Sequence, residues 1–232
     1  RQVITMDGHR FVGHVGWRQD RQTFDALSAK YTPLKNLSLQ YAYITQRNRI
    51  FAQDADLDAK DHLVNAAYKT EYGTLTGYGY LLEVDNNTEN ALDTFGVSFA
   101  GSTKTSDIKV LYRAEYASQS SESAVADYDV DYFNLEVGAV VSGITTKVGY
   151  EVLGSDSGAF GFATPLATLH KFNGWSDQFL GTPAEGLVDT NVSLAGKALG
   201  GGWKVVYHKF DADNASATVD DLGSELNLSY VK

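Results

Sequence analysis

The chain has 232 residues, of which 43% are hydrophobic and 21% charged, a balance that is typical of a folded protein and excludes intrinsic disorder. A length of this order suits one all-β domain, so we expect residues 1–232 to form a single domain. The net charge of -10 excludes general nucleic-acid binding, because such binding requires a basic surface. The absence of cysteine excludes disulfides and thiolate metal sites.

The composition favours strands and tight turns over helices, with 14 Tyr, 11 Phe and 22 Gly but only 3 Pro. No segment approaches the run of about 18 apolar residues that a membrane-spanning helix requires. Any passage through a membrane must therefore use strands, in which only alternate residues face lipid. Residues 1–10 also lack the apolar core of a secretion signal, so we expect the sequence to be mature, truncated or both.

Alternating segments recur along the chain, each about as long as the 9–11 residues that a tilted transmembrane strand needs. The clearest begins at Ile108, where apolar residues alternate with polar ones as far as Tyr116, with Leu111 as the exception. Tight turns between such segments predict hairpins. We expect these at 31–45 with its predecessor, at 63–84 turning near Tyr72 and Gly73, at 92–118 turning near Thr105, at 132–152 turning at Ser142 and Gly143, and at 188–210 turning at Gly200 to Gly202, followed by a strand at 222–231.

The connections alternate between short turns and long polar loops, the longer ones lying at 52–61, 85–92 and 118–127. This asymmetry is typical of bacterial barrels. The sequence therefore predicts an all-β, antiparallel, up-and-down transmembrane β-barrel with eleven or twelve strands in this chain, either complete or part of a larger barrel. Five tyrosines near strand ends fit an interfacial girdle: Tyr68, Tyr116, Tyr128, Tyr132 and Tyr150.

One long segment, residues 158–187, breaks the alternation and contains Pro165 and Pro183. Long structured loops usually have a role, so this loop would narrow or plug the passage. A surface loop with a short helical turn explains the same pattern, and both interpretations stay open.

Five stretches of sequence resemble the alginate-export family of outer-membrane barrels. The resemblance implies a bacterial outer-membrane location, a monomeric barrel with more strands than are counted here, and an arginine-rich conduit for an anionic polysaccharide. This chain would then be part of the barrel. The stretches are RFVGHVGWRQDRQTFDAL (10–27), LQYAYITQRNRIF (39–51), FATPLATLHKFNGWSDQFLGTP (162–183), GWKVVYHKFDAD (202–213) and LGSELNL (222–228).

Arginines are concentrated at the start of the chain, where residues 1–50 hold six of the seven. Guanidinium groups stay charged and bind carboxylates with two hydrogen bonds, so inward arginines could guide a uronate chain. The alternative is that some lie in turns or pair with Asp20 and Asp25. The candidates in this region are Arg18, Arg21, Arg47 and Arg49.

Further cations are predicted on the inward side of later strands, facing Glu115, Glu136, Glu151 and Glu225. Mixed charges across a lumen cross-link its wall, which is the structural interpretation. Where cations exceed acids at a constriction, anions pass preferentially. The candidate solute-binding residues here are Lys109, Arg113, Lys147, Lys204 and His208, with Lys197 as a further inward cation.

Catalytic and metal-binding motifs are weak. Asp54, Asp56 and Asp58 resemble a calcium loop, but Ala59 stands where that loop requires glycine. The five histidines lack metal-ligand spacing, and no Gly-x-Ser-x-Gly elbow occurs. We therefore expect no enzyme activity, no metal and no cofactor, and keep a Ser–His–acid hydrolase at the rim as a remote alternative.

The sequence thus predicts a porin that passes a polar, anionic solute such as a uronate-containing saccharide. The expected partners are the lipid bilayer, lipopolysaccharide, an anionic oligosaccharide and a periplasmic or extracellular protein, without nucleic acid. The alternative function is an outer-membrane scaffold that sheathes a partner protein without transporting solute.

Overall fold

The computed structural model describes residues 1–86, 90–124 and 126–232. In this part of the chain eleven strands form one antiparallel sheet, and each strand pairs with the next in sheet order. The predicted all-β, up-and-down fold is confirmed. The strands are β1 (Thr23–Leu34), β2 (Leu37–Asn48), β3 (Leu57–Lys69), β4 (Gly73–Glu83), β5 (Asn90–Thr105), β6 (Ile108–Ser123), β7 (Tyr128–Val141), β8 (Ile144–Leu153), β11 (Leu187–Ala198), β12 (Gly201–Asp211) and β13 (Asp221–Val231).

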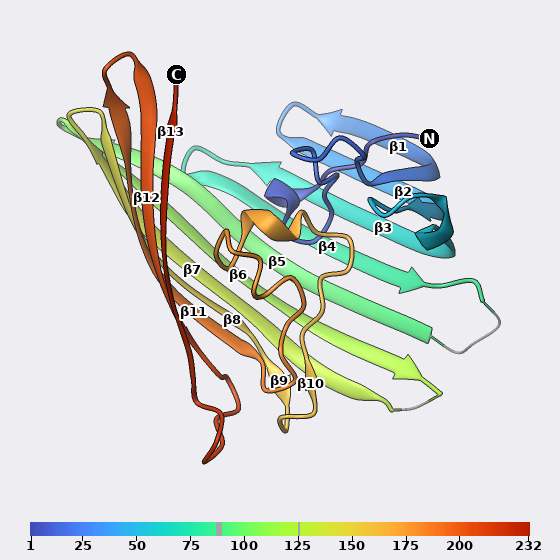
Figure 1. Ribbon diagram of the computed structural model, residues 1–232. Helices are drawn as coiled ribbons and strands as arrows, with labels where there is room; N and C mark the ends of the chain where they lie inside the picture. The colour runs from blue at the N-terminus through green and yellow to red at the C-terminus, as the bar shows by residue number, and fades with distance from the viewer. Residues whose placement is uncertain (87–89, 125) are drawn as a thin grey trace.

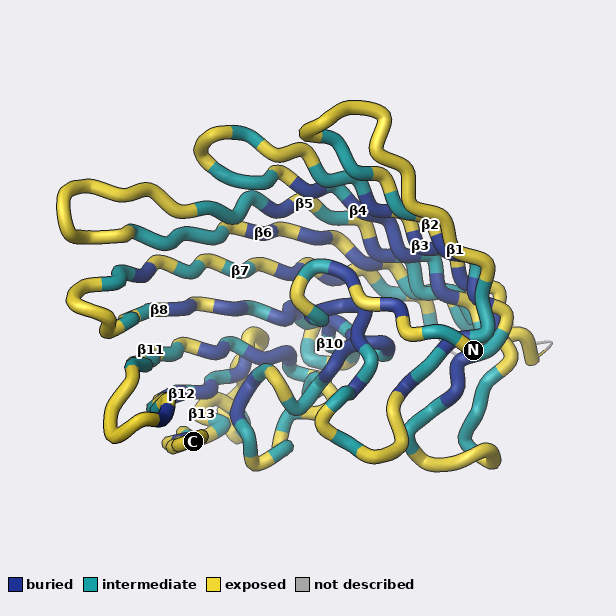
Figure 2. The backbone as a smooth tube through the Cα atoms, turned by 90° about the horizontal axis from the view of Figure 1, so that it is seen from above, coloured by how far each residue is buried: buried dark blue, intermediate teal, exposed yellow. Residues whose placement is uncertain are grey.

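The sheet curves around a concave face, as Figures 1 and 2 show, with β1 at one edge and β13 at the other. These two edge strands do not pair with each other within the described residues, so the sheet is an open section of a barrel wall. Among the described residues no helix has the length and apolar character to cross a membrane.

Alternation gives the sheet two different faces. On β7, Phe133, Leu135 and Val137 are exposed on the convex side, whereas Asn134 and Glu136 point to the concave side. The convex side of neighbouring strands is equally apolar, because register places like residues opposite each other, as in Val137 and Val148. An apolar surface of this extent is unfavourable in water and suits contact with lipid.

The predicted girdle tyrosines lie on different faces of the sheet, because odd and even positions of a strand point to opposite sides. Tyr68, Tyr116 and Tyr150 are 43–49% exposed among the apolar residues of the convex side. For Tyr132 the girdle prediction is wrong: this side chain is only 1% exposed and donates a hydrogen bond to Glu151 at 2.6 Å. Tyr128 shares its parity and stacks on Phe160, with ring centroids 4.7 Å apart.

Short turns lie at one end of the sheet and the long loops at the other. The turn at Ser142 and Gly143 has φ values of 50° and 80°. Two consecutive positive φ values define the two-residue hairpin turn whose twist matches that of the strands, and glycine removes the steric cost at one of them. The sequence prediction of this turn is confirmed.

Two segments form an inner layer on the concave face, residues 1–22 and 154–186 (Figures 1 and 2). They bind each other: Val12 forms a parallel bridge with Leu166, and the Gln22 side chain donates to the carbonyls of Gly13 and Leu166 at 2.9 and 3.0 Å. The layer contains η1 (Asp7–His9), β9 (Ser155–Asp156), β10 (Phe160–Gly161) and η3 (Leu169–Lys171), while η2 (Gln53–Ala55) lies in the β2–β3 loop.

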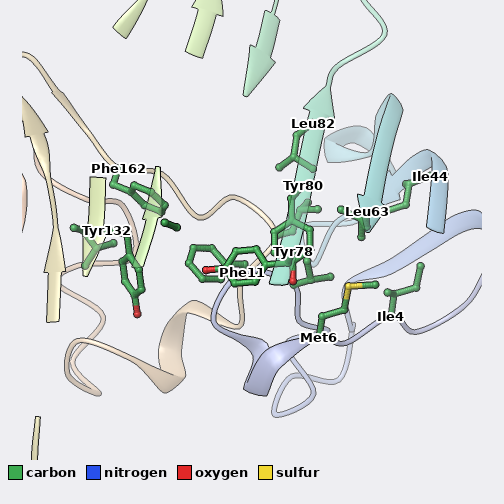
Figure 3. Close-up of a cluster of buried hydrophobic side chains, with 14 of the residues drawn as sticks. Ile4, Met6, Phe11, Ile44, Leu63, Tyr78, Tyr80, Leu82, Tyr132 and Phe162 are labelled. Atoms are coloured by element: carbon green, nitrogen blue, oxygen red, sulfur yellow. The ribbon is translucent and has the colours of Figure 1, made fainter. Parts of the chain in front are cut away.

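The hydrophobic core lies between this inner layer and the sheet. Figure 3 shows Phe11 among Tyr78, Tyr80, Tyr132 and Phe162, with ring centroids 5.2–6.1 Å from its own. Aromatic rings at such separations add to the free energy gained by burying apolar surface. The core therefore fixes the inner layer to β4 and β7.

Candidate functional site in the concave face

A polar cavity of about 390 Å³, here called the central cavity, lies between the inner layer and strands β6, β7, β8, β11 and β12. Strands supply one wall, because alternate residues along part of β6, β7, β8, β11 and β12 line it. The charged groups and the histidine around it are Asp7, Arg10, Arg113, Glu115, Glu136, Lys147, Glu151, Lys171, Asp189, Lys204 and His208.

Three basic side chains of the central cavity contact acids on the same wall. Arg113 binds Glu115 at 2.7 Å, and Lys147 binds Glu136 at 2.8 Å. Nδ1 of His208 lies 2.9 Å from a carboxylate oxygen of Asp189. Such pairs cross-link adjacent positions of the sheet and cancel much of the field that each charge would project into the cavity.

Arg10 joins the inner layer to this wall. Its Nε donates to Glu151 at 2.7 Å, and its guanidinium lies 4.7 Å from the ring centroid of Phe172. Glu151 also accepts hydrogen bonds from the hydroxyl of Tyr132 and from Asn173 at 2.6 and 2.7 Å. This carboxylate is therefore saturated and serves as a structural junction.

Asp7, the acid that η1 contributes to the cavity, faces neutral donors. Asn65 and Tyr80 donate to its carboxylate at 2.6 and 2.9 Å. Burial raises the pKa of Asp7, and these hydrogen bonds together with the charge of Arg113 oppose the shift only in part.

Four of the nine sequence-predicted residues line the central cavity: Arg113, Lys147, Lys204 and His208. Lys109 instead lies exposed next to the β5–β6 turn, opposite Lys104. The alternation of strands β6, β8 and β12 placed these side chains correctly on the concave side, and the position along each strand decides which of them reach the cavity.

The structure does not gather the four N-terminal arginines around a passage. Arg47 is buried and donates to both carboxylate oxygens of Asp61 at 2.8 and 2.6 Å. Arg49 is half-buried near the β2–β3 loop, where burial, followed by the charge of Arg47, lowers its pKa. Arg18 and Arg21 precede β1, so strand alternation does not apply to them, and Arg21 is exposed.

The acids expected to pair with these arginines also differ from the prediction. Asp25 accepts a hydrogen bond from Asn48 at 3.2 Å. Arg47 pairs with an acid on the neighbouring strand, and the sequence alone did not indicate this pairing.

A second hollow of about 520 Å³, here called the basic groove, adjoins the central cavity. Lys171, Trp175 and Lys204 line both spaces. Among the described residues that line it, none is Asp or Glu. The groove is lined by His9, His14, Gly16, Trp17, Thr168, His170, Lys171, Trp175 and Lys204.

Aromatic rings contact basic side chains in and beside the groove. The rings of Trp17 and His170 have centroids 4.2 Å apart, and the guanidinium of Arg18 lies 4.7 Å from the Trp17 ring. Lys171 Nζ donates to the carbonyl of Gly8 at 2.6 Å. Burial, followed by the charges of Arg113 and Lys204, lowers the pKa of Lys171.

Sequence reasoning missed Arg10, Lys171 and both groove tryptophans as site residues. They lie outside the strands, where no period of two indicates which way a side chain points. The available signal was the long non-alternating segment itself, which contains Lys171 and Trp175.

No protein-family profile matches the sequence, and no curated protein matches it. The resemblance to the alginate-export family is therefore not confirmed. Solved structures do match in fold. Pseudomonas aeruginosa OccK3 (OpdO) aligns with a TM-score of 0.70 at 12% identity, over 99% of this chain and 63% of that one.

Two further structures were determined with small molecules. Pseudomonas aeruginosa OpdK with vanillate aligns with a TM-score of 0.74 at 13% identity, over 95% of this chain and 61% of that one. OccK2 (OpdF) of the same organism, in complex with glucuronate, gives 0.71 at 12% identity, over 94% of this chain and 62% of that one. The neighbours are outer-membrane porins, which are non-enzymatic channels. This chain has their β-barrel fold and spans 61–63% of the length of these three structures.

Proposed function

We propose that the protein is an outer-membrane channel for polar, anionic solutes and that this chain forms part of its wall. One observation carries the proposal: the convex face is an apolar band, whereas the concave face holds a polar cavity next to a basic groove. A wall with these two faces shields a polar path from lipid, and fixed charges along the path replace part of the hydration of a solute. No chemical step is required.

The chemistry of the structural neighbours supports an anionic solute. Vanillate and glucuronate, the molecules named for OpdK and OccK2, both carry a carboxylate. We extend this to a uronate-containing saccharide as the solute, with the bilayer and lipopolysaccharide as the surroundings of the barrel.

The inner layer favours a second candidate function. Residues 1–22 and 154–186 occupy part of the concave face, which an unobstructed passage would not need. A barrel obstructed in this way could serve as a scaffold for a periplasmic or extracellular protein without passing solute.

Conductance separates the two functions. The protein is inserted in planar bilayers, reversal potentials are measured under a salt gradient, and oligouronates are added as blockers. The channel proposal expects anion-selective current that oligouronates block. Absence of current after verified insertion would contradict it and favour the scaffold.

A further inference from the structure

Lysines gather at the short-turn end of the sheet (Figure 1). Segments 30–36, 69–73, 104–109 and 197–201, which contain or adjoin four of the short turns, hold six lysines but only two acids, Glu71 and Asp107. The charge of these segments is therefore +4, in a chain whose net charge is -10. All six lysines are exposed. This surface, here called the basic rim, consists of Lys30, Lys35, Lys69, Lys104, Lys109 and Lys197.

The fold does not neutralise the charge of the basic rim. Among the described residues, the lysines that form ion pairs are Lys60, Lys147 and Lys209, none of which belongs to the rim. Lys104 and Lys109 of the rim lie directly opposite each other on β5 and β6. Like charges in this arrangement destabilise a strand pair. A negatively charged partner would offset that repulsion, so the rim is suited to binding one.

Strand alternation places the rim lysines away from lipid. Tyr68 and Ile108 are exposed on the convex side, and Lys69 and Lys109 follow them directly in β3 and β6. Successive residues of a strand point to opposite faces, so these lysines lie on the concave side. They therefore surround the mouth of the passage, whereas lipid headgroups would lie against the convex side.

The extent of the rim indicates a large partner. The turns of β2 and β11, next to Lys35 and Lys197, are seven strand spacings apart in the sheet order. At about 4.8 Å per spacing, the rim covers roughly 30 Å of the curved sheet end. A small anion reaches one or two of these lysines, whereas a protein surface reaches most of them. We propose that the basic rim is a docking surface for a periplasmic protein with an acidic surface; from the proposed function this takes only the periplasmic placement of the short turns.

The test uses a fluorescent polyglutamate peptide of about 20 residues as the acidic probe, because it is long enough to contact several rim lysines at once. The protein is folded in phosphatidylcholine nanodiscs, and binding is followed by fluorescence anisotropy at several salt concentrations. Binding should be saturable and should weaken as salt rises. The Kd should rise about 5-fold in the double variant Lys104→Gln, Lys109→Gln, and about 20-fold when Lys69→Gln and Lys197→Gln are added.

The double variant Lys60→Gln, Lys209→Gln is the matched control. It removes the same charge from the long-loop end, where each of the two lysines lies within 4.0 Å of two acids. Its Kd should stay within about 2-fold of the wild type. The urea midpoint of Lys104→Gln should equal or exceed that of the wild type, because the substitution removes a like-charge contact. A lower midpoint would show that this lysine serves the fold instead of a partner.

Three results would overturn the inference. One is equal affinity of the wild type and the Lys104→Gln, Lys109→Gln variant for polyglutamate. Another is competition by triglutamate at the same total carboxylate concentration, which would indicate separate sites for small anions. The third is weaker energy transfer from the tryptophans to pyrene-labelled phosphatidylglycerol in that variant, which would assign the rim to lipid headgroups. Binding is measured without current, so failure here leaves the channel proposal in place, and absence of current counts only against the channel.

Discussion

At the residue scale, the Arg10–Glu151 pair gives the sharpest stability prediction. Both residues are at most 5% exposed, so removing one partner leaves an uncompensated buried charge. We expect Arg10→Met to destabilise the docked inner layer by about 3–5 kcal/mol. Urea titration followed by tryptophan fluorescence measures this, because Trp17 and Trp175 lie in the inner layer.

The double variant Arg10→Met, Glu151→Met tests whether the loss comes from the pair itself. It should be less unstable than the sum of the two single variants. A double variant with fully additive losses would show that the two charges do not stabilise each other.

His9 gives a prediction about pH. Burial, then the charges of Lys171 and His14, lowers its pKa below the ordinary value, so His9 is neutral at pH 7.5. Protonation on acidification adds positive charge to a groove already lined by Lys171 and Lys204, with Asp177 as the acid that lies 2.6 Å from Nδ1 of His170. Glucuronate should therefore block several-fold more strongly at pH 5 than at pH 7.5, and less of this increase should remain in His9→Gln.

Acidification should strengthen glucuronate block but lower the stability of the docked inner layer. Because the folded state holds the pKa of His9 below its unfolded value, the neutral form contributes stability that is lost as pH falls through the unfolded pKa. The urea midpoint of the inner layer should fall on acidification in the wild type and fall less in His9→Gln. An equal fall in both proteins would mean that another group dominates.

At the scale of elements, Glu225 of β13 anchors the loop between β8 and β11. Its carboxylate accepts hydrogen bonds from the backbone of Trp175 and Ser176 at 2.5 and 2.9 Å, and from the Ser176 hydroxyl at 2.5 Å. We expect Glu225→Gln to loosen the loop, because neutral acceptors bind donors less strongly. Open-channel current noise should rise several-fold, whereas Glu71→Gln, an exposed acid in a turn, should leave it unchanged.

The elements also show what the sequence could predict. Strands such as β6, β7 and β8 were predictable because they alternate, and the parity of Arg113, Lys147, Lys204 and His208 set their side of the sheet correctly. The prediction at 31–45 was wrong, because this segment runs across the turn between β1 and β2. The inner layer was not predictable in this way, since neither Arg10 nor Lys171 belongs to a repeating pattern. Its packing depends on contacts between distant segments, such as that between Val12 and Leu166.

At the scale of the whole molecule, the apolar convex face predicts that charged substitutions on that face reduce folding into a membrane. Val148 is 52% exposed in the middle of β8 and would face lipid. Val148→Arg should cost about 2–4 kcal/mol if that position lies near the membrane midplane. The yield of folded protein in lipid vesicles, measured by its altered gel mobility without heating, should fall accordingly.

Ser193→Arg is the matched control, because this residue lines the central cavity from the next strand. Its folded yield should stay close to that of the wild type while its ion selectivity changes. Equal yields for the two arginine variants would contradict the assignment of the convex face to lipid.

The arrangement of the inner layer also has a consequence for the order of folding. Sheet neighbours lie close along the chain except across the β8–β11 loop, whereas contacts within the inner layer join residues as far apart as Val15 and Thr168, separated by 153 positions. Closing such long loops costs entropy before the contacts repay it, so these contacts should form last. During assembly we therefore expect a short-lived stage in which the sheet has formed but the inner layer has not yet docked. The lumen would be wide at this stage, so the protein would conduct ions before it becomes selective among solutes.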